Sequence, residues 1–189
     1  MKLSGVVKIA VLAGLATVLM SLRVPLFAPY LKVDVSECPA LIAAFALGPA
    51  YGAAVVLLKN LLFGITNFQL MELVGLPLNT LAGLTLVLVS SNIYRLHKTK
   101  RMAVTSLALG TLAMTLVMIP ANILLLPAFY RIFLDTSMNT DGLTTTVVTL
   151  ITPFNLVKGS LTSILTFLVY KRFSAILKAD PELNGKPLA

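Results

Sequence analysis

The chain has 189 residues, of which 58% are hydrophobic and 12% are charged. This balance lies outside the range of ordinary soluble domains and indicates a polytopic membrane protein. A single cysteine (Cys38) and a single histidine (His97) exclude a disulfide framework and a clustered thiol or imidazole metal site. The net charge of +8 does not call for a nucleic-acid partner, because basic residues beside membrane segments are explained by topology.

The first predicted span covers residues 6–22. A signal peptide is the alternative, but no clear small-x-small cleavage site precedes the next polar segment. Two small-x-x-x-small pairs, Ala10 with Gly14 and Ala13 with Thr17, form a strip that permits close approach of another helix. That helix could belong to the same bundle or to a second subunit.

Residues 39–65 are apolar but contain Gly48-Pro49, which favours a break or turn. One kinked helix or two short helices would fit this stretch. Two helices would be shorter than the roughly twenty residues of a straight span, so length alone disfavours the split. The distribution of charge is needed to decide between them.

Three further spans are predicted at residues 73–94, 102–130 and 144–170, which gives five or six in total. With six, the basic clusters gather on one side of the membrane, whereas five would place them on opposite faces. Because basic residues concentrate on the cytoplasmic side, the pattern favours six. The cytoplasmic side would hold Lys2, Lys8, Arg95, Lys98, Lys100, Arg101, Lys171, Arg172, Lys178 and Lys186, and the other side Asp34, Glu37, Glu72, Asp135 and Asp141.

We therefore expect an all-α membrane protein with six transmembrane helices and both termini in the cytoplasm. Residues 1–177 would form one transmembrane domain, and residues 178–189, which lack apolar periodicity, a cytoplasmic tail. The protein would be a multi-pass component of the cell membrane.

Lys158 is the most informative residue, because it lies near the middle of the last apolar stretch. A lysine at bilayer depth is costly and marks a functional site by default. Asn155 precedes it by three residues and so lies on nearly the same helical face. Asn79 and Asn122 follow prolines in the two preceding helices, and the four side chains are predicted to converge on a cavity open to the outside.

Each of these residues also has a simpler interpretation. An asparagine can stabilise packing by bonding to a neighbouring helix, and a lysine can extend to the membrane surface. Lys59-Asn60 is interpreted as an interfacial anchor and cap, and Glu72 or Asp34 could serve as the counter-ion of Lys158. A pocket with these donors and apolar walls would suit a neutral, flat, partly polar molecule.

Several stretches together resemble the riboflavin-type substrate-binding S components of energy-coupling-factor (ECF) vitamin transporters, over roughly residues 5–172. The stretches are residues 31–39 (Leu-Lys-Val-Asp-Val-Ser-Glu-Cys-Pro), Gly48-Pro49-x-x-Gly52, Lys59-Asn60, Pro120-Ala121-Asn122 and residues 153–159 (Pro-Phe-Asn-Leu-Val-Lys-Gly).

The resemblance implies a six-helix S-component fold that binds a vitamin near its outer face, beneath the loop joining the first two helices. It implies polar recognition of riboflavin by Asn79, Asn122, Asn155 and Lys158, and residues 23–37 would act as a gate. Apolar or aromatic neighbours of the vitamin would be Leu31, Phe129 and Tyr130. It also implies a transmembrane coupling subunit, contacted by Ala10, Ala13, Gly14 and Thr17, and two cytoplasmic ATPases. The family's alanine-x-x-x-alanine pattern is altered here to Ala10-x-x-x-Gly14.

The chain has no G-x-x-x-x-G-K-[ST] phosphate loop, so the energy for uptake is expected to come from its partners. We expect a riboflavin-binding transport subunit in the lipid bilayer, without enzymatic activity, a cofactor or a nucleic-acid partner. Two alternatives are an S component for another vitamin or precursor, and a stand-alone secondary transporter in which Lys158 couples a proton or ion. A membrane-embedded enzyme would need a nucleophile and base or a metal cluster at depth, and no such constellation is visible.

Overall fold

The structure is a computed structural model that describes residues 3–67, 69, 72–133 and 139–178. Within these residues the chain is mostly helical. Its elements are α1 (Leu3–Ser21), β1 (Val24–Leu26), β2 (Ala28–Val33), α2 (Glu37–Leu47), α3 (Pro49–Thr66), α4 (Glu72–Leu96), α5 (Lys100–Phe133), α6 (Thr140–Thr146), the π-helical turn η1 (Val147–Ile151) and α7 (Thr152–Lys178). The predicted tail at residues 178–189 lies outside the described residues except for Lys178, which ends α7.

The apolar character of these helices fits a membrane environment. Within the described parts of the chain, four stretches are long and apolar enough to cross a bilayer, namely Pro49–Thr66, Glu72–Leu96, Lys100–Phe133 and Thr140–Phe173. Gly5–Ser21 and Glu37–Leu47 are also apolar but shorter. The coarse prediction of a multi-pass helical protein is thus confirmed.

The break predicted at Gly48-Pro49 is present. Gly48 has a φ of 123°, a conformation that L side chains rarely adopt, and its N–H bonds to the Ala44 carbonyl to end α2. Pro49 then occupies the first turn of α3, where its missing N–H costs nothing. Two helices therefore replace one, and α2 is buried along most of its length because α1, α3, α4 and α7 surround it.

The prediction of an all-α fold was wrong between the first two helices. β1 and β2 pair antiparallel, with Val24 opposite Val33, to form a hairpin at residues 24–33. Phe27 at the turn has a φ of 66° and an exposed side chain. The prolines at positions 25 and 29 made this segment look like an irregular loop, but proline is compatible with the edges of a two-stranded ribbon.

Proline residues shape the two longest helical segments. α5 continues through Pro120 and Pro127, although each removes one backbone donor. The last helical segment begins at Thr140, four residues before the predicted start at residue 144, and η1 ends two residues before Pro153. In η1 the chain makes a wider turn, and the Thr152 hydroxyl donates to the Val147 carbonyl five residues earlier.

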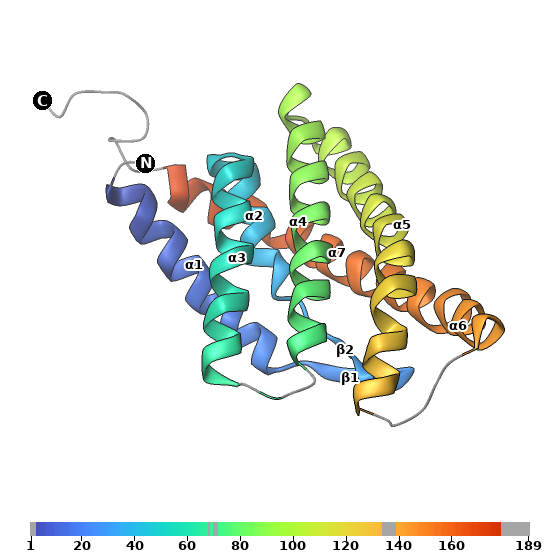
Figure 1. The fold of residues 1–189 in the computed structure, drawn as a ribbon. Helices are drawn as coiled ribbons and strands as arrows, with labels where there is room; N and C mark the ends of the chain where they lie inside the picture. The colour runs from blue at the N-terminus through green and yellow to red at the C-terminus, as the bar shows by residue number, and fades with distance from the viewer. Residues whose placement is uncertain (1–2, 68, 70–71, 134–138, 179–189) are drawn as a thin grey trace, which may run out of the picture.

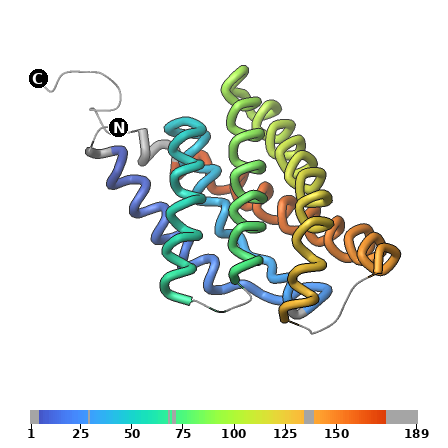
Figure 2. The backbone as a smooth tube through the Cα atoms, viewed as in Figure 1, coloured from blue at the N-terminus to red at the C-terminus, as the bar shows by residue number. Residues whose placement is uncertain are grey.

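The helices form a bundle with two distinct ends (Figure 1). The hairpin lies at one end, beside the start of α4 and the end of α5, and we call this the hairpin end. The start of α1, the α2–α3 turn, the α4–α5 turn and the described end of α7 lie toward the opposite end. Figure 2 shows α7 crossing obliquely behind α4 and α5.

Two groups of buried side chains fill the bundle. The larger joins α1, α2, α3, α4 and α5, and the smaller packs the end of α5 against η1, with Leu126 and Phe129 meeting Val147 and Ile151. Close backbone approach supports this packing at Gly110, because a β-carbon there would lie 1.9 Å from the Ser90 hydroxyl on α4. The cavity described next lies near the smaller group.

Candidate functional site

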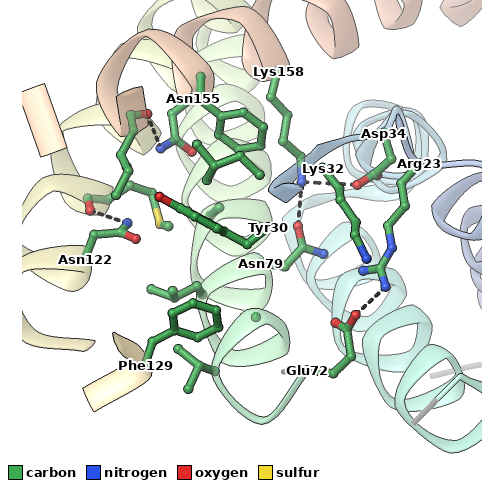
Figure 3. Close-up of a pocket in the computed structure, with 18 of the residues that line it drawn as sticks. Arg23, Tyr30, Lys32, Asp34, Glu72, Asn79, Asn122, Phe129, Asn155 and Lys158 are labelled. Atoms are coloured by element: carbon green, nitrogen blue, oxygen red, sulfur yellow. Dashed lines mark hydrogen bonds and ion pairs between the residues drawn. The ribbon is translucent and has the colours of Figure 1, made fainter. Parts of the chain in front are cut away.

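A cavity of about 430 Å³ opens near the hairpin end and is bordered by the hairpin and by α4, α5, η1 and α7 (Figure 3). That volume lies within the usual range for small-molecule sites. Six of the seven residues predicted to bind ligand line it, whereas Tyr130 does not. The lining residues are Met20, Arg23, Tyr30, Leu31, Lys32, Asp34, Glu72, Val74, Gly75, Leu78, Asn79, Ala82, Met118, Asn122, Leu126, Phe129, Ile151, Phe154, Asn155 and Lys158.

Lys158 lies at the polar side of the cavity and does not extend to the protein surface. Its ammonium donates to Asn79 Oδ1 at 2.5 Å and to Asp34 Oδ2 at 3.3 Å. The lysine side chain is 8% exposed and the Asp34 side chain 3%. Burial by itself raises the pKa of the Asp34 carboxyl, but the Lys158 and Lys59 ammonium groups outweigh it and hold the pKa below its usual value. The proposed counter-ion at Asp34 is therefore present.

A second buried ion pair lies directly behind the first. Lys59 donates to Glu37 Oε1 at 2.8 Å and to the Ser36 hydroxyl at 2.6 Å, and its side chain has no exposed surface. Glu37 Oε2 also lies 3.9 Å from the Lys158 ammonium. Two lysines and two carboxylates thus form one cluster without net formal charge, as buried charges require.

The interpretation of Lys59-Asn60 as an interfacial anchor was wrong. Both side chains point into the bundle, and Asn60 Oδ1 accepts from Asn79 Nδ2 at 3.0 Å. Asn79 in turn accepts from Lys158, so the two asparagines connect α3 to α7 through α4. Glu72, the other suggested counter-ion, pairs instead with Arg23, whose guanidinium also lies over the Phe63 ring.

Asn122 and Asn155 present their amide oxygens to the cavity. Each Nδ2 donates to a carbonyl one turn earlier in the same helix, Met118 at 2.7 Å and Ile151 at 2.9 Å. In Figure 3 the two amide nitrogens point toward those carbonyls, and the oxygens point toward the open space. Both residues are buried, so these oxygens are acceptors with little access to bulk solvent.

Aromatic side chains close the hairpin side of the cavity. The Tyr30 ring on β2 lies 5.7 Å from the Phe129 ring, and its hydroxyl is 3.2 Å from that of Tyr130. Burial and the bond to Tyr130 raise the pKa of Tyr30, so its phenol remains protonated. Tyr130 therefore contacts the hairpin, whereas Leu31 and Phe129 line the cavity.

The predicted strip on α1 divides between two faces. Ala13 is fully buried, and the Thr17 hydroxyl bonds to the Ala13 carbonyl and, at 3.4 Å, to the Lys59 carbonyl. Ala10 is exposed, and a β-carbon at Gly14 would meet no atom within 4 Å. Ala10, Gly14 and Thr17 therefore retain surface that another protein could contact, whereas Ala13 does not.

Sequence reasoning missed the roles of Arg23, Tyr30 and Glu37. A useful clue was that Asp34 and Glu37 directly precede the apolar stretch of α2, while Lys59 and Lys158 occur inside other apolar stretches. Because buried charges are normally paired, two such acids and two such bases favour mutual pairing.

The site combines hydrogen-bond acceptors, the ammonium groups of Lys32 and Lys158, and aromatic walls around one cavity. Among the described residues, no group of three or more histidine, cysteine, aspartate or glutamate side chains could hold a metal ion. The carboxylates at positions 34 and 37 are already bonded to lysines. This arrangement is suited to binding a flat, polar-edged molecule.

A bundle of apolar helices, with a largely apolar cavity that has one polar side beneath a hairpin at one end, defines a membrane-embedded small-molecule binder. The comparison with protein families is more specific, since the model for the ECF transporter, substrate-specific component, matches residues 5–170. The chain belongs to this family of transporter components.

Individual relatives support the same assignment. The chain is 33% identical to a riboflavin transporter, RibU, of Staphylococcus aureus (strain TCH60), over 91% of each chain. It is 36% identical to a riboflavin transporter, FmnP, of Bacillus subtilis (strain 168), over 90% of this chain and 92% of the relative. A solved structure described as the S component of a bacterial ECF transporter superposes with a TM-score of 0.77 at 33% identity, covering 92% of this chain and 97% of that one.

Proposed function

We propose that this protein is the membrane-embedded subunit that captures riboflavin from outside the cell for ATP-driven uptake by an ECF transporter. The observation that carries the proposal is the cavity in which Asn122, Asn155 and Lys158 surround a space of about 430 Å³. Two relatives that match about nine-tenths of the chain are named as riboflavin transporters. The chemistry of the cavity is consistent with that ligand.

Riboflavin has a flat three-ring system with an edge that alternates carbonyl oxygens and a ring N–H, and it carries a hydroxylated side chain. The oxygens of Asn122 and Asn155 are suited to accept hydrogen bonds from N–H or hydroxyl groups. Two acceptors already bond to Lys158, so its remaining N–H is available for a ligand oxygen or ring nitrogen. Leu31 and Phe129 supply apolar surface for the rings.

The proposed topology has six membrane spans, with the hairpin end outside and both termini in the cytoplasm. Exposed basic residues at the α4–α5 turn, including Arg95, Lys98 and Arg101, lie toward the same end of the bundle as the start of α1. A concentration of lysine and arginine favours the cytoplasmic side. The cavity would then open outward, in the cell membrane.

The partners would be a transmembrane coupling subunit and two cytoplasmic ATPases. The absence of a phosphate-loop motif from the sequence supports an external source of energy. On α1, Ala10 and Gly14 would meet the coupling subunit, because small exposed residues permit close helix contact. Thr17, which is partly exposed, would belong to the same face, and Ala13 would support it from within the bundle.

Binding of tritiated riboflavin to the purified protein tests the proposal directly. We expect saturable binding, a yellow preparation after expression with riboflavin, and weaker binding in Asn155→Ala and Lys158→Ala. Each substitution removes a hydrogen-bonding group and should reduce affinity at least about tenfold. Absence of riboflavin binding by the wild-type protein would refute the function, and unchanged affinity in both variants would refute the site.

A further inference from the structure

Asp34 connects the hairpin to the polar side of the cavity. It directly follows β2, and its Oδ1 accepts from the Ser36 backbone N–H at 2.9 Å. Its other oxygen, Oδ2, lies 3.3 Å from the Lys158 ammonium on α7. The carboxylate therefore lies at the junction between a segment that covers the cavity and a residue that lines it.

The direction of the Lys158 ammonium depends on its acceptors. Of its three N–H groups, one bonds to Asn79 and one to Asp34, which leaves the third for the cavity. Glu37 Oε2 at 3.9 Å is beyond hydrogen-bond distance, and the other oxygen of that carboxylate bonds to Lys59. Without Asp34, the ammonium would be drawn toward Glu37 and its free N–H would change direction.

Docking of the hairpin brings Asp34 into place. The segment of residues 23–34, which contains the hairpin, contacts α5 through Tyr30, α4 through Arg23 and α7 through Asp34. The first two contacts lie in partly buried surroundings, whereas Asp34 and Lys158 are both buried. Moving the segment outward would separate a buried ion pair and release the ammonium from one of its two acceptors.

We propose that Asp34 is a positioning residue. It orients the Lys158 ammonium toward the cavity only when the hairpin is docked over the cavity. This inference rests on the proposed riboflavin-binding function. Only the seated segment supplies the carboxylate that directs the free N–H of Lys158 toward the ligand. Closure of the segment would thus strengthen binding through a residue that need not touch riboflavin itself.

The test compares Asp34→Asn, Asp34→Glu and the matched control Asp141→Asn, whose exposed carboxylate lies in α6 away from the cavity. Riboflavin affinity is measured by fluorescence titration, the dissociation rate by stopped flow, and hydrogen bonding to the rings by the absorption spectrum of the bound flavin. We expect Asp34→Asn to weaken binding about 10- to 100-fold, speed dissociation and alter the spectrum. Asp34→Glu should recover most of the affinity, and Asp141→Asn should match the wild type.

A second variant distinguishes the positioning role of Asp34 from a purely structural role. Asp34→Asn leaves two lysines facing one carboxylate, so the variant could unfold. The double variant Asp34→Asn with Lys59→Met again has equal numbers of buried positive and negative charges. We expect its thermal stability to recover while riboflavin binding remains weak, because Lys158 turns toward Glu37.

The outcomes distinguish failure of the inference from failure of the proposed function on which it rests. A wild-type protein that does not bind riboflavin would refute both. Wild-type affinity and spectrum in Asp34→Asn, or in the double variant, would overturn the positioning role while leaving the proposed function intact. Equal weakness of Asp34→Glu and Asp34→Asn would also overturn it, because the carboxylate charge would then not matter.

Discussion

Replacing Lys59 by methionine should strongly destabilise the protein. The Lys59 ammonium lies 2.8 Å from Glu37 Oε1, and neither side chain has more than 2% exposed surface. At an effective dielectric constant of about 20, unit charges at this separation attract by about 6 kcal/mol. Part of that loss is offset because the ammonium no longer has to be dehydrated, so the free energy of unfolding should fall by about 3–5 kcal/mol.

Thermal unfolding of the purified protein in detergent, followed by circular dichroism, measures this effect. For a chain of this size the expected loss corresponds to a fall in Tm of about 6–20 °C. The matched control is Lys98→Met, because Lys98 is exposed in the α4–α5 turn. The double variant Lys59→Met with Glu37→Gln should recover much of the loss, since Asp34 and Lys158 remain paired. A fall in Tm no larger than that of the control would refute the assignment of a buried ion pair.

Three further predictions concern packing, pH and the cavity mouth. Gly110→Ala should lower Tm, because its β-carbon would overlap the Ser90 hydroxyl. Adding Ser90→Ala should restore part of the loss. Equal Tm values for wild type and Gly110→Ala would contradict this close approach. The pKa of Asp34 is lower in the folded protein than in the unfolded chain, so its stabilising effect is complete above about pH 4 and is lost as pH falls through the lowered value. Riboflavin affinity and Tm should therefore be level between about pH 5 and pH 8, and a sharp change in either across this interval would contradict an ionised Asp34. Tyr130→Phe should speed riboflavin dissociation roughly fivefold by removing the bond to Tyr30, and an unchanged rate in stopped flow would show that this contact does not hold the hairpin.

Local sequence rules predicted the features that are set by residues close together in the sequence. Gly48-Pro49 ended one helix and began the next because a left-handed glycine and a first-turn proline act locally. The convergence of Asn122, Asn155 and Lys158 was also predictable, because buried polar side chains in apolar helices must share polar surroundings.

Other features depended on contacts between distant parts of the sequence. The burial of Lys59 depends on Glu37, which lies 22 residues away and on another helix. Tyr30 is 100 residues from Tyr130, so no local pattern indicated that the hairpin would cover the cavity. Helical periodicity gives the face on which a side chain lies, but it does not identify the element that this face will meet.

The π-helical turn at Val147–Ile151 makes the site sensitive to chain length as well as to residue type. One residue corresponds to about 100° of rotation around an α-helix. Deleting a single residue from η1 would therefore turn Asn155 and Lys158 away from their present direction relative to α6, although both side chains would still be in the sequence. The ligand-facing surface of this protein is thus encoded partly in the number of residues before Pro153, a property that a scan by substitution alone would leave undetected.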